Sequence, residues 1–89
     1  MQVIWKAQLQ CTDKQTIDLP KGAEVLCVQT QNELPCIWFL VSDVDSIHKE
    51  PRTFYIYGTG HKHEAIGDGL YIGTFQLQGG KLVFHVFEE

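Results

Sequence analysis

The chain has 89 residues, a length that fits a single domain spanning residues 1–89. Hydrophobic residues make up 44% and charged residues 20% of the sequence, which is typical of a soluble globular domain and too apolar for a disordered one. Eleven acidic residues against seven basic ones give a formal net charge of −4. This charge argues against general nucleic-acid binding, which needs a basic face. The longest apolar run, residues 36–41, is too short to span a bilayer.

In chain order, the dominant hydrophobic period is two residues, which predicts strands. Strands are expected near residues 3–8, 16–19, 24–30, 36–41, 53–57, 70–77 and 82–87. The pair Gly79-Gly80 predicts a two-residue hairpin turn, whereas residues 32–35 predict a looser connection. Six to seven short strands in a chain of this length favour an all-β fold, either a small antiparallel sandwich or an open barrel.

The central strands are apolar on both faces, most clearly at residues 36–41 and 82–87. A domain this small cannot bury both faces of several strands, so the excess apolar surface predicts a homo-oligomer, most simply a two-fold dimer. The predicted core consists of Trp5, Leu26, Val28, Trp38, Leu40, Phe54, Ile56, Ile72, Phe75, Leu82, Phe84 and Val86.

The three cysteines, Cys11, Cys27 and Cys36, are an odd number and have no C-x-x-C spacing. This pattern is not that of a secreted disulfide scaffold, a thioredoxin-type site or a zinc knuckle. Residues 1–10 alternate apolar with polar side chains and lack the apolar centre of a secretory signal. We therefore expect a cytoplasmic protein with reduced thiols, in which Cys27 and Cys36 are small core residues.

One segment, residues 55–63, combines aromatic, glycine and cationic residues. Glycines let backbone N–H groups converge on an anion, while hydroxyl, imidazole and ammonium groups add further donors. Tyrosines on one face of the preceding strand suit a base or a ribose. These features predict a site for a small anionic, nucleotide-like ligand at Arg52, Tyr55, Tyr57, Gly58, Thr59, Gly60, His61 and Lys62. The alternative interpretation is a structural bulge or hairpin at a strand end.

Catalytic and metal sites are weaker interpretations of the same segment. His61 and His63 would share one strand face, but no third ligand stands nearby at a telling spacing. Only His48 or His85, from elsewhere in the chain, could complete a site, so no metal and no cofactor are expected. The carboxylates fall in turns and no Gly-x-Ser-x-Gly elbow is present, so we do not expect an enzyme. His85 is expected to be partly buried with one hydrogen bond.

An ordered set of short motifs covers nearly the whole chain. It consists of Ile4-Trp5-Lys6, Ile17-Asp18-Leu19-Pro20-Lys21-Gly22-Ala23, Val28-Gln29, Pro35-Cys36-Ile37-Trp38, Tyr57-Gly58-Thr59-Gly60-His61, Tyr71-Ile72-Gly73-Thr74 and Val83-Phe84-His85-Val86-Phe87-Glu88. This set resembles a family of short bacteriophage proteins of unknown function. The resemblance implies a phage or prophage origin and action in the host bacterial cytoplasm, and it brings no catalytic residues to carry over.

Small phage proteins often counter host defence, so two binding functions are expected by class. The first is an anti-defence sponge that sequesters a nucleotide immune signal without cleaving it. The alternative is an inhibitor that covers a host defence protein with an acidic or apolar surface. The net charge of −4 favours the inhibitor. The sponge is favoured by a cluster of basic residues in the two longest loops, namely Lys49, Arg52, His61, Lys62 and His63.

Overall fold

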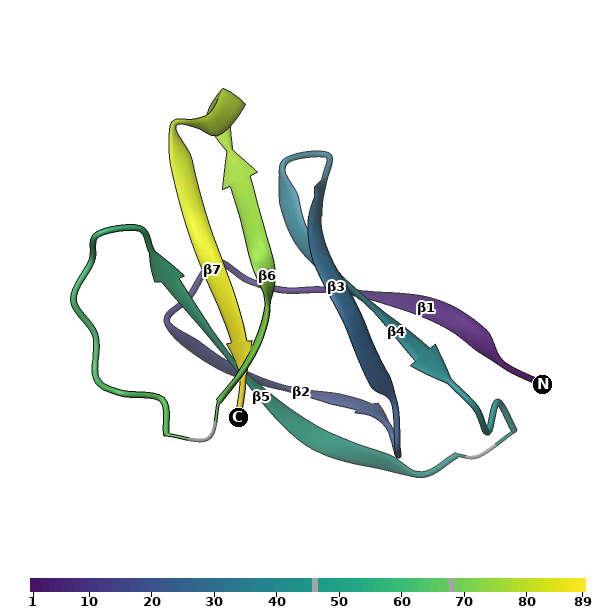
Figure 1. The fold of residues 1–89 in the computed structure, drawn as a ribbon. Coiled ribbons are helices and arrows are strands. Elements are labelled where there is room, and N and C mark those ends of the chain that lie inside the picture. Colours follow the sequence, from purple (N-terminus) through teal and green to yellow (C-terminus); the bar gives the residue numbers. More distant parts are fainter. Residues whose placement is uncertain (46, 68) are drawn as a thin grey trace.

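A computed structural model describes residues 1–45, 47–67 and 69–89; Ser46 and Asp68, which fall in two polar loops, lie outside the described residues. The described chain forms seven antiparallel strands in two open sheets (Figure 1). They are β1 (Val3–Gln8), β2 (Lys14–Pro20), β3 (Glu24–Gln31), β4 (Leu34–Val41), β5 (Lys49–Gly58), β6 (Leu70–Leu77) and β7 (Leu82–Glu88). The all-β class predicted from the period of two is confirmed.

The two sheets enclose one core and approach each other closely at β3 and β6 (Figure 1). The three-stranded sheet has the order β1-β4-β3, and the four-stranded sheet has the order β2-β5-β7-β6. Gly73 permits this approach, because a Cβ atom at its position would lie only 2.9 Å from Cγ1 of Val28. The register of β6 against β7 shifts just before Gly73, and such a bulge increases the local twist of a strand.

The buried core lies between the inner faces of both sheets. Its members are Leu9, Leu19, Ala23, Val28, Ile37, Phe39, Val41, Phe54, Ile56, Phe75 and Val86. Five predicted core residues are confirmed as buried: Val28, Phe54, Ile56, Phe75 and Val86. Ile72 and Phe84 are partly buried against this core. Three others are between 39% and 45% exposed and do not belong to it: Trp5, Leu26 and Leu82.

The central strand β4 buries the face opposite to the one that we predicted. Trp38 and Leu40 are half-buried on the outer face of the sheet, whereas Ile37, Phe39 and Val41 are buried in the core. Alternation along a strand defines two faces, but it does not determine which face meets the second sheet when both are apolar. The neighbouring strands then decide, because they place the rest of the core on one side.

Both hairpin turns differ in length from their predictions. The pair Leu77↔Leu82 leaves residues 78–81 in the β6–β7 turn, so this turn is longer than two residues and contains the 3₁₀ turn η1 (Gln78–Gly80). In the β3–β4 hairpin the turn consists of Asn32 and Glu33 alone, with φ angles of 53° and 64°. Two consecutive positive φ angles are typical of a type I′ turn. Glutamate rarely adopts this conformation, so the pair Asn32-Glu33 does not predict so tight a turn.

The sequence placed two of the three cysteines in the core. Cys36 is buried, as expected, whereas Cys27 is only partly buried and Cys11 is exposed.

Within the described ranges, no helix is long and apolar enough to cross a membrane.

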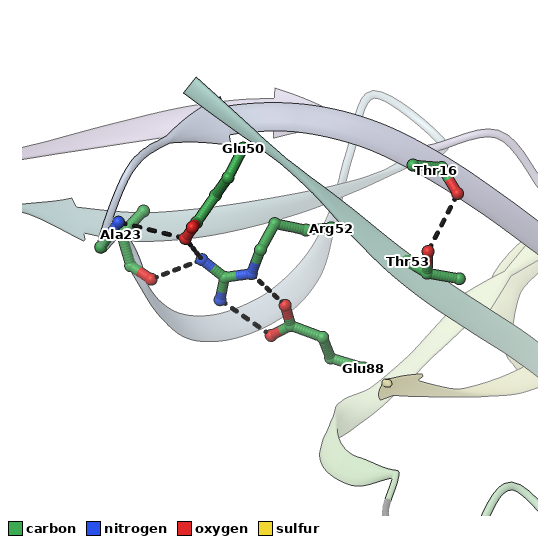
Figure 2. A network of polar contacts seen from close by, with 7 residues as sticks. Thr16, Ala23, Glu50, Arg52, Thr53 and Glu88 are labelled. Carbon is green, nitrogen blue, oxygen red and sulfur yellow. Dashed lines mark hydrogen bonds and ion pairs between the residues drawn. The ribbon is translucent and has the colours of Figure 1, made fainter. Parts of the chain in front are cut away.

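An ion-pair network connects the β2–β3 turn to β5 and β7 (Figure 2). Nε and Nη2 of Arg52 donate to the carboxylate of Glu88, whose exposure is only 8%. Nη1 of Arg52 donates to the carbonyl of Ala23 at 2.8 Å and lies 3.5 Å from Oε1 of Glu50, which accepts from the N–H of Gly22. Hydrogen bonding to Glu88 raises the pKa of Arg52, so the guanidinium stays charged wherever the protein is folded.

Candidate functional site

The outer face of the four-stranded sheet carries an aromatic pocket of about 260 Å³. The strand register brings its walls together, since Tyr57 pairs with His85 and Tyr71 pairs with Phe87. These four residues alternate with inward-facing neighbours, so their side chains lie on the side of the sheet away from the core. The full lining is Tyr57, Gly58, Thr59, Gly60, His61, His63, Tyr71, His85 and Phe87.

A tight turn at residues 58–61 forms the end of this pocket. The N–H of His61 donates to the carbonyl of Gly58 at 3.1 Å, and Gly60 has a φ of +82°, as the third residue of a type II turn requires. The imidazole of His61 folds back over Gly58, where a Cβ atom would lie 2.7 Å from Nδ1. Gly58 therefore leaves the space that the imidazole of His61 occupies.

The backbone of this turn differs from the anion cradle expected from its glycines. The N–H of Thr59 donates to the carbonyl of Val83 at 3.1 Å, and the N–H of His61 is held by Gly58. Both groups are therefore bonded within the protein. The turn offers mainly its side chains to a ligand, in place of two of the backbone donors that the pattern suggested.

His85 is the centre of a hydrogen-bond chain along the pocket. Its Nε2 lies 2.6 Å from Oγ1 of Thr59, and its Nδ1 lies 3.0 Å from Oγ1 of Thr74. The hydroxyl of Tyr71 lies 2.5 Å from the same Oγ1 of Thr74. His85 thus makes two side-chain hydrogen bonds, where the sequence analysis expected one.

The hydrogen bond at the Thr59 end determines which atom donates between Thr59 and His85. Thr59 donates its hydroxyl proton to the carbonyl of Val83, which can only accept. Nε2 of His85 then donates to Thr59, because the hydroxyl proton of Thr59 is already used. These hydrogen bonds fix the rotamers of both threonines and of Tyr71.

The imidazole of His63 stacks on the phenol ring of Tyr57, with centroids 3.7 Å apart and 6° between the ring planes. Nδ1 of His63 donates to the carbonyl of Glu64 at 2.9 Å, which fixes the ring within its loop. On the sheet, Tyr57 is also flanked by Tyr55 at 6.1 Å and by Phe87 at 6.3 Å between centroids. Tyr57 therefore presents a flat aromatic surface on which a nitrogen heterocycle already lies.

The phenol of Tyr57 remains a hydrogen-bond donor over a wide pH range. Burial raises its pKa above the ordinary value, and the nearby Tyr55 and Asp13 contribute in the same direction because a second negative charge there is unfavourable. At neutral pH the hydroxyl is therefore protonated and can donate to a ligand.

The structure brings five of the eight predicted site residues together in the pocket: Tyr57, Gly58, Thr59, Gly60 and His61. Tyr55 stacks beside Tyr57 but does not line the pocket. Lys62 is exposed and is not part of the lining. Arg52, the remaining predicted site residue, does not line the pocket, because its guanidinium is bonded to Glu88 and Ala23 (Figure 2). Its side chain shares the core-facing side of β5 with Phe54 and Ile56.

Tyr71, His85 and Phe87 were not predicted as pocket residues, and His63 was considered as a metal ligand and as a member of the basic loop cluster. These residues come from β6, β7 and the loop after β5, so only the strand register brings them to Tyr57. The signal available was their alternation, since His85 and Phe87 share one face of the last strand. Among the described residues, no group of three or more His, Cys, Asp or Glu is placed to hold a metal ion.

A family model described as Domain of unknown function (DUF7352) matches residues 1–89, and the chain belongs to this family. No curated protein and no solved structure matches the chain. The expected likeness to a family of unknown function is thereby confirmed over the whole chain. A phage origin stays a prediction.

Proposed function

We propose that this member of the family is a binding protein that holds a small planar heteroaromatic ligand, such as a nucleobase or a nucleotide, beside Tyr57. The observation that carries the proposal is the parallel stack of the His63 imidazole on the Tyr57 ring, at 3.7 Å between centroids. A nucleobase would make the same contact with the same face of the phenol. The hydroxyl of Tyr57 supplies a donor beside that surface.

The size of the pocket restricts the ligand. Its volume of about 260 Å³ is slightly below the range of roughly 300–1,000 Å³ that is usual for sites of drug-sized molecules. A base would enter this pocket by taking the place of the His63 imidazole on Tyr57, with further groups extending out of the pocket. The aromatic walls formed by Tyr71 and Phe87, whose ring centroids are 5.4 Å apart, suit an apolar, flat group.

The polar groups of the pocket favour binding without turnover. Both nitrogens of His85 are engaged by threonine hydroxyls, so this imidazole is committed to the protein. Among the described residues that line the pocket, none is a carboxylate or a cysteine. Such a lining supplies neither the carboxylate pair nor the activated nucleophile that hydrolytic enzymes use.

Sequestration of a nucleotide immune signal in an infected bacterium is the specific role that this kind of binding would serve. That role, the phage origin and the identity of the ligand stay predictions. The physical proposal, a heteroaromatic ligand held on Tyr57, is independent of them and can be tested with purified protein alone.

A release assay tests the proposal. The purified protein is incubated with adenosine 5′-monophosphate, a cyclic dinucleotide and ADP-ribose, freed of unbound ligand, and denatured by heat. Mass spectrometry of the supernatant is expected to recover at least one of these compounds intact, and not from a Tyr57→Leu variant. Recovery of a cleaved product would identify an enzyme, and uptake of none of the three would contradict the proposal.

A second candidate function, association with another protein chain, is favoured by the outer face of the three-stranded sheet. Ile4 and Leu40 pair across β1 and β4 on this face, with Trp38 next to them, and Leu26 of β3 is 44% exposed. The nearest candidate partner is a second copy of the chain; a host defence protein is the alternative. Light scattering at high micromolar concentration should give a dimer, and a monomer for Ile4→Lys. A monomeric wild-type protein would rule out self-association.

A further inference from the structure

A second cavity, of about 180 Å³, adjoins the aromatic pocket at the turn of residues 58–61. It is lined by Gly58, Thr59, His61, Lys81, Leu82, Val83 and Phe84. Three of these residues, Gly58, Thr59 and His61, also line the aromatic pocket. The two cavities are therefore neighbours that share one turn of the backbone as a wall.

The cavity exists because β7 extends beyond the end of β5. The last pair between these strands is Gly58↔Phe84, whereas β6 continues to pair with β7 as far as Leu82. Beyond Gly58 the chain forms one more backbone bond to β7, from the N–H of Thr59 to Val83, and then turns away. The start of β7 is consequently left uncovered on its β5 side, next to the end of the β6–β7 turn.

Lys81 gives this cavity a positive charge. It is the last residue of the β6–β7 turn, its side chain is exposed, and within the described parts of the chain it forms no ion pair. The imidazole of His61 lies against Gly58, on the wall that the cavities share. An ammonium and an imidazole are donors that recognise a phosphate group.

We infer that the second cavity receives the phosphate of the ligand whose base stacks on Tyr57, so that the ligand class is a nucleotide and not a free base or nucleoside. Lys81 and His61 hold the anionic group, and the ribose crosses the shared turn. Lys81, which was not among the predicted site residues, thereby supplies the cation that Arg52 and Lys62 were expected to contribute. This inference rests on the proposed function and adds the second half of the site.

The experiment compares adenosine with adenosine 5′-monophosphate by NMR titration of three proteins: wild type, Lys81→Gln and Lys62→Gln. Lys62 is an exposed lysine next to His61 that lines neither cavity, so it is the matched control for charge. The wild type should bind the monophosphate about tenfold more tightly than adenosine, since a charge-assisted bond of this kind is the difference between them. Lys81→Gln should remove that difference and leave the affinity for adenosine unchanged, while Lys62→Gln should change neither.

The possible failures are distinguishable. The inference is overturned if adenosine binds and the monophosphate binds no more tightly than adenosine. It is also overturned if Lys81→Gln lowers the affinity for both ligands equally, because the second cavity then holds no phosphate. If the wild type binds neither compound, the inference is overturned, and the release assay decides separately whether the proposed function holds. Raising the salt concentration gives a second readout, because it should weaken the binding of the monophosphate and leave the binding of adenosine unchanged.

Discussion

The imidazole of His63 and the phenol of Tyr57 lie face to face, 3.7 Å apart at their centroids and 6° from parallel. His63 belongs to the irregular loop that follows β5, and Tyr57 belongs to β5 itself. The loop thus folds back onto the pocket that it borders. A ligand that uses the same face of Tyr57 must displace this imidazole, so His63 acts as a competitor for the stacking surface.

Substituting His63 should therefore strengthen binding. An aromatic pair of this kind contributes about 0.5–1.5 kcal/mol beyond its buried area, so His63→Ala should raise the affinity for adenosine 5′-monophosphate by roughly two- to tenfold. NMR titration measures the change, with His48→Ala, a histidine of another loop, as the control. Weaker binding by His63→Ala would mean that the imidazole contacts the ligand instead of competing with it.

Arg52 should matter for stability and not for binding. Arg52→Gln leaves the carboxylate of Glu88, which is 8% exposed, without its charged partner, and loss of one member of such a buried pair costs about 3 kcal/mol. Urea denaturation should detect this loss, whereas Lys49→Gln, at the exposed start of the same strand, should change the free energy of unfolding by less than about 0.5 kcal/mol.

The binding of nucleotides separates the two roles of Arg52. Under conditions in which Arg52→Gln is folded, its affinity for adenosine 5′-monophosphate should equal that of the wild type, because its guanidinium faces Glu88 and not the pocket. An Arg52→Gln protein that is folded under these conditions but binds the monophosphate less tightly would restore Arg52 to the site.

The face of Arg52 could have been read from the sequence, but the full pocket could not. Residues 52, 54 and 56 share one face of a strand, and Phe54 and Ile56 were already assigned to the core, so the alternation places Arg52 inside. The turn at residues 58–61 was found because its members are consecutive. His85 and Phe87 depend on the register between β5 and β7, which no local pattern encodes.

The fold class was predictable because a period of two leaves few alternatives in a chain without helical stripes. The face that β4 buries was not, because Trp38 and Leu40 on one side are as apolar as Ile37 and Phe39 on the other. A strand with two apolar faces is oriented by the strands beside it. The choice is therefore made by tertiary packing and not by the local sequence.

The close approach of Gly73 to Val28 should leave no room for a larger side chain at residue 73. A methyl group at residue 73 would meet Cγ1 of Val28 at 2.9 Å, so Gly73→Ala should destabilise the protein by about 1–3 kcal/mol through overpacking. A double-mutant cycle tests the cause, because Val28→Ala removes the Cγ1 atom. In that background Gly73→Ala should cost at least about 0.5 kcal/mol less. Additive effects would show that the two residues are not in contact.

The raised pKa of Tyr57 predicts an alkaline limit to stability. The folded protein holds the phenol proton more tightly than the unfolded chain, whose tyrosines titrate at about pH 10. This contribution to stability is complete below that pH and is lost as the pH rises through the raised pKa. Urea denaturation between about pH 9 and 11 should give a shallower decline for Tyr57→Phe than for the wild type. Identical slopes would show that Tyr57 titrates normally.

The affinity of two leucine variants for adenosine 5′-monophosphate tests the stacking surface most directly. Tyr55 and Tyr57 lie on the same face of β5, but only Tyr57 lines the pocket. NMR titration should therefore find binding weakened about tenfold or more in Tyr57→Leu, as expected when an aromatic stack and a hydroxyl donor are both lost. Tyr55→Leu should bind within about twofold of the wild type, since a residue without ligand contact contributes little. Equal affinities for wild type and Tyr57→Leu, with both proteins folded by circular dichroism, would contradict the assignment of this pocket as the binding site.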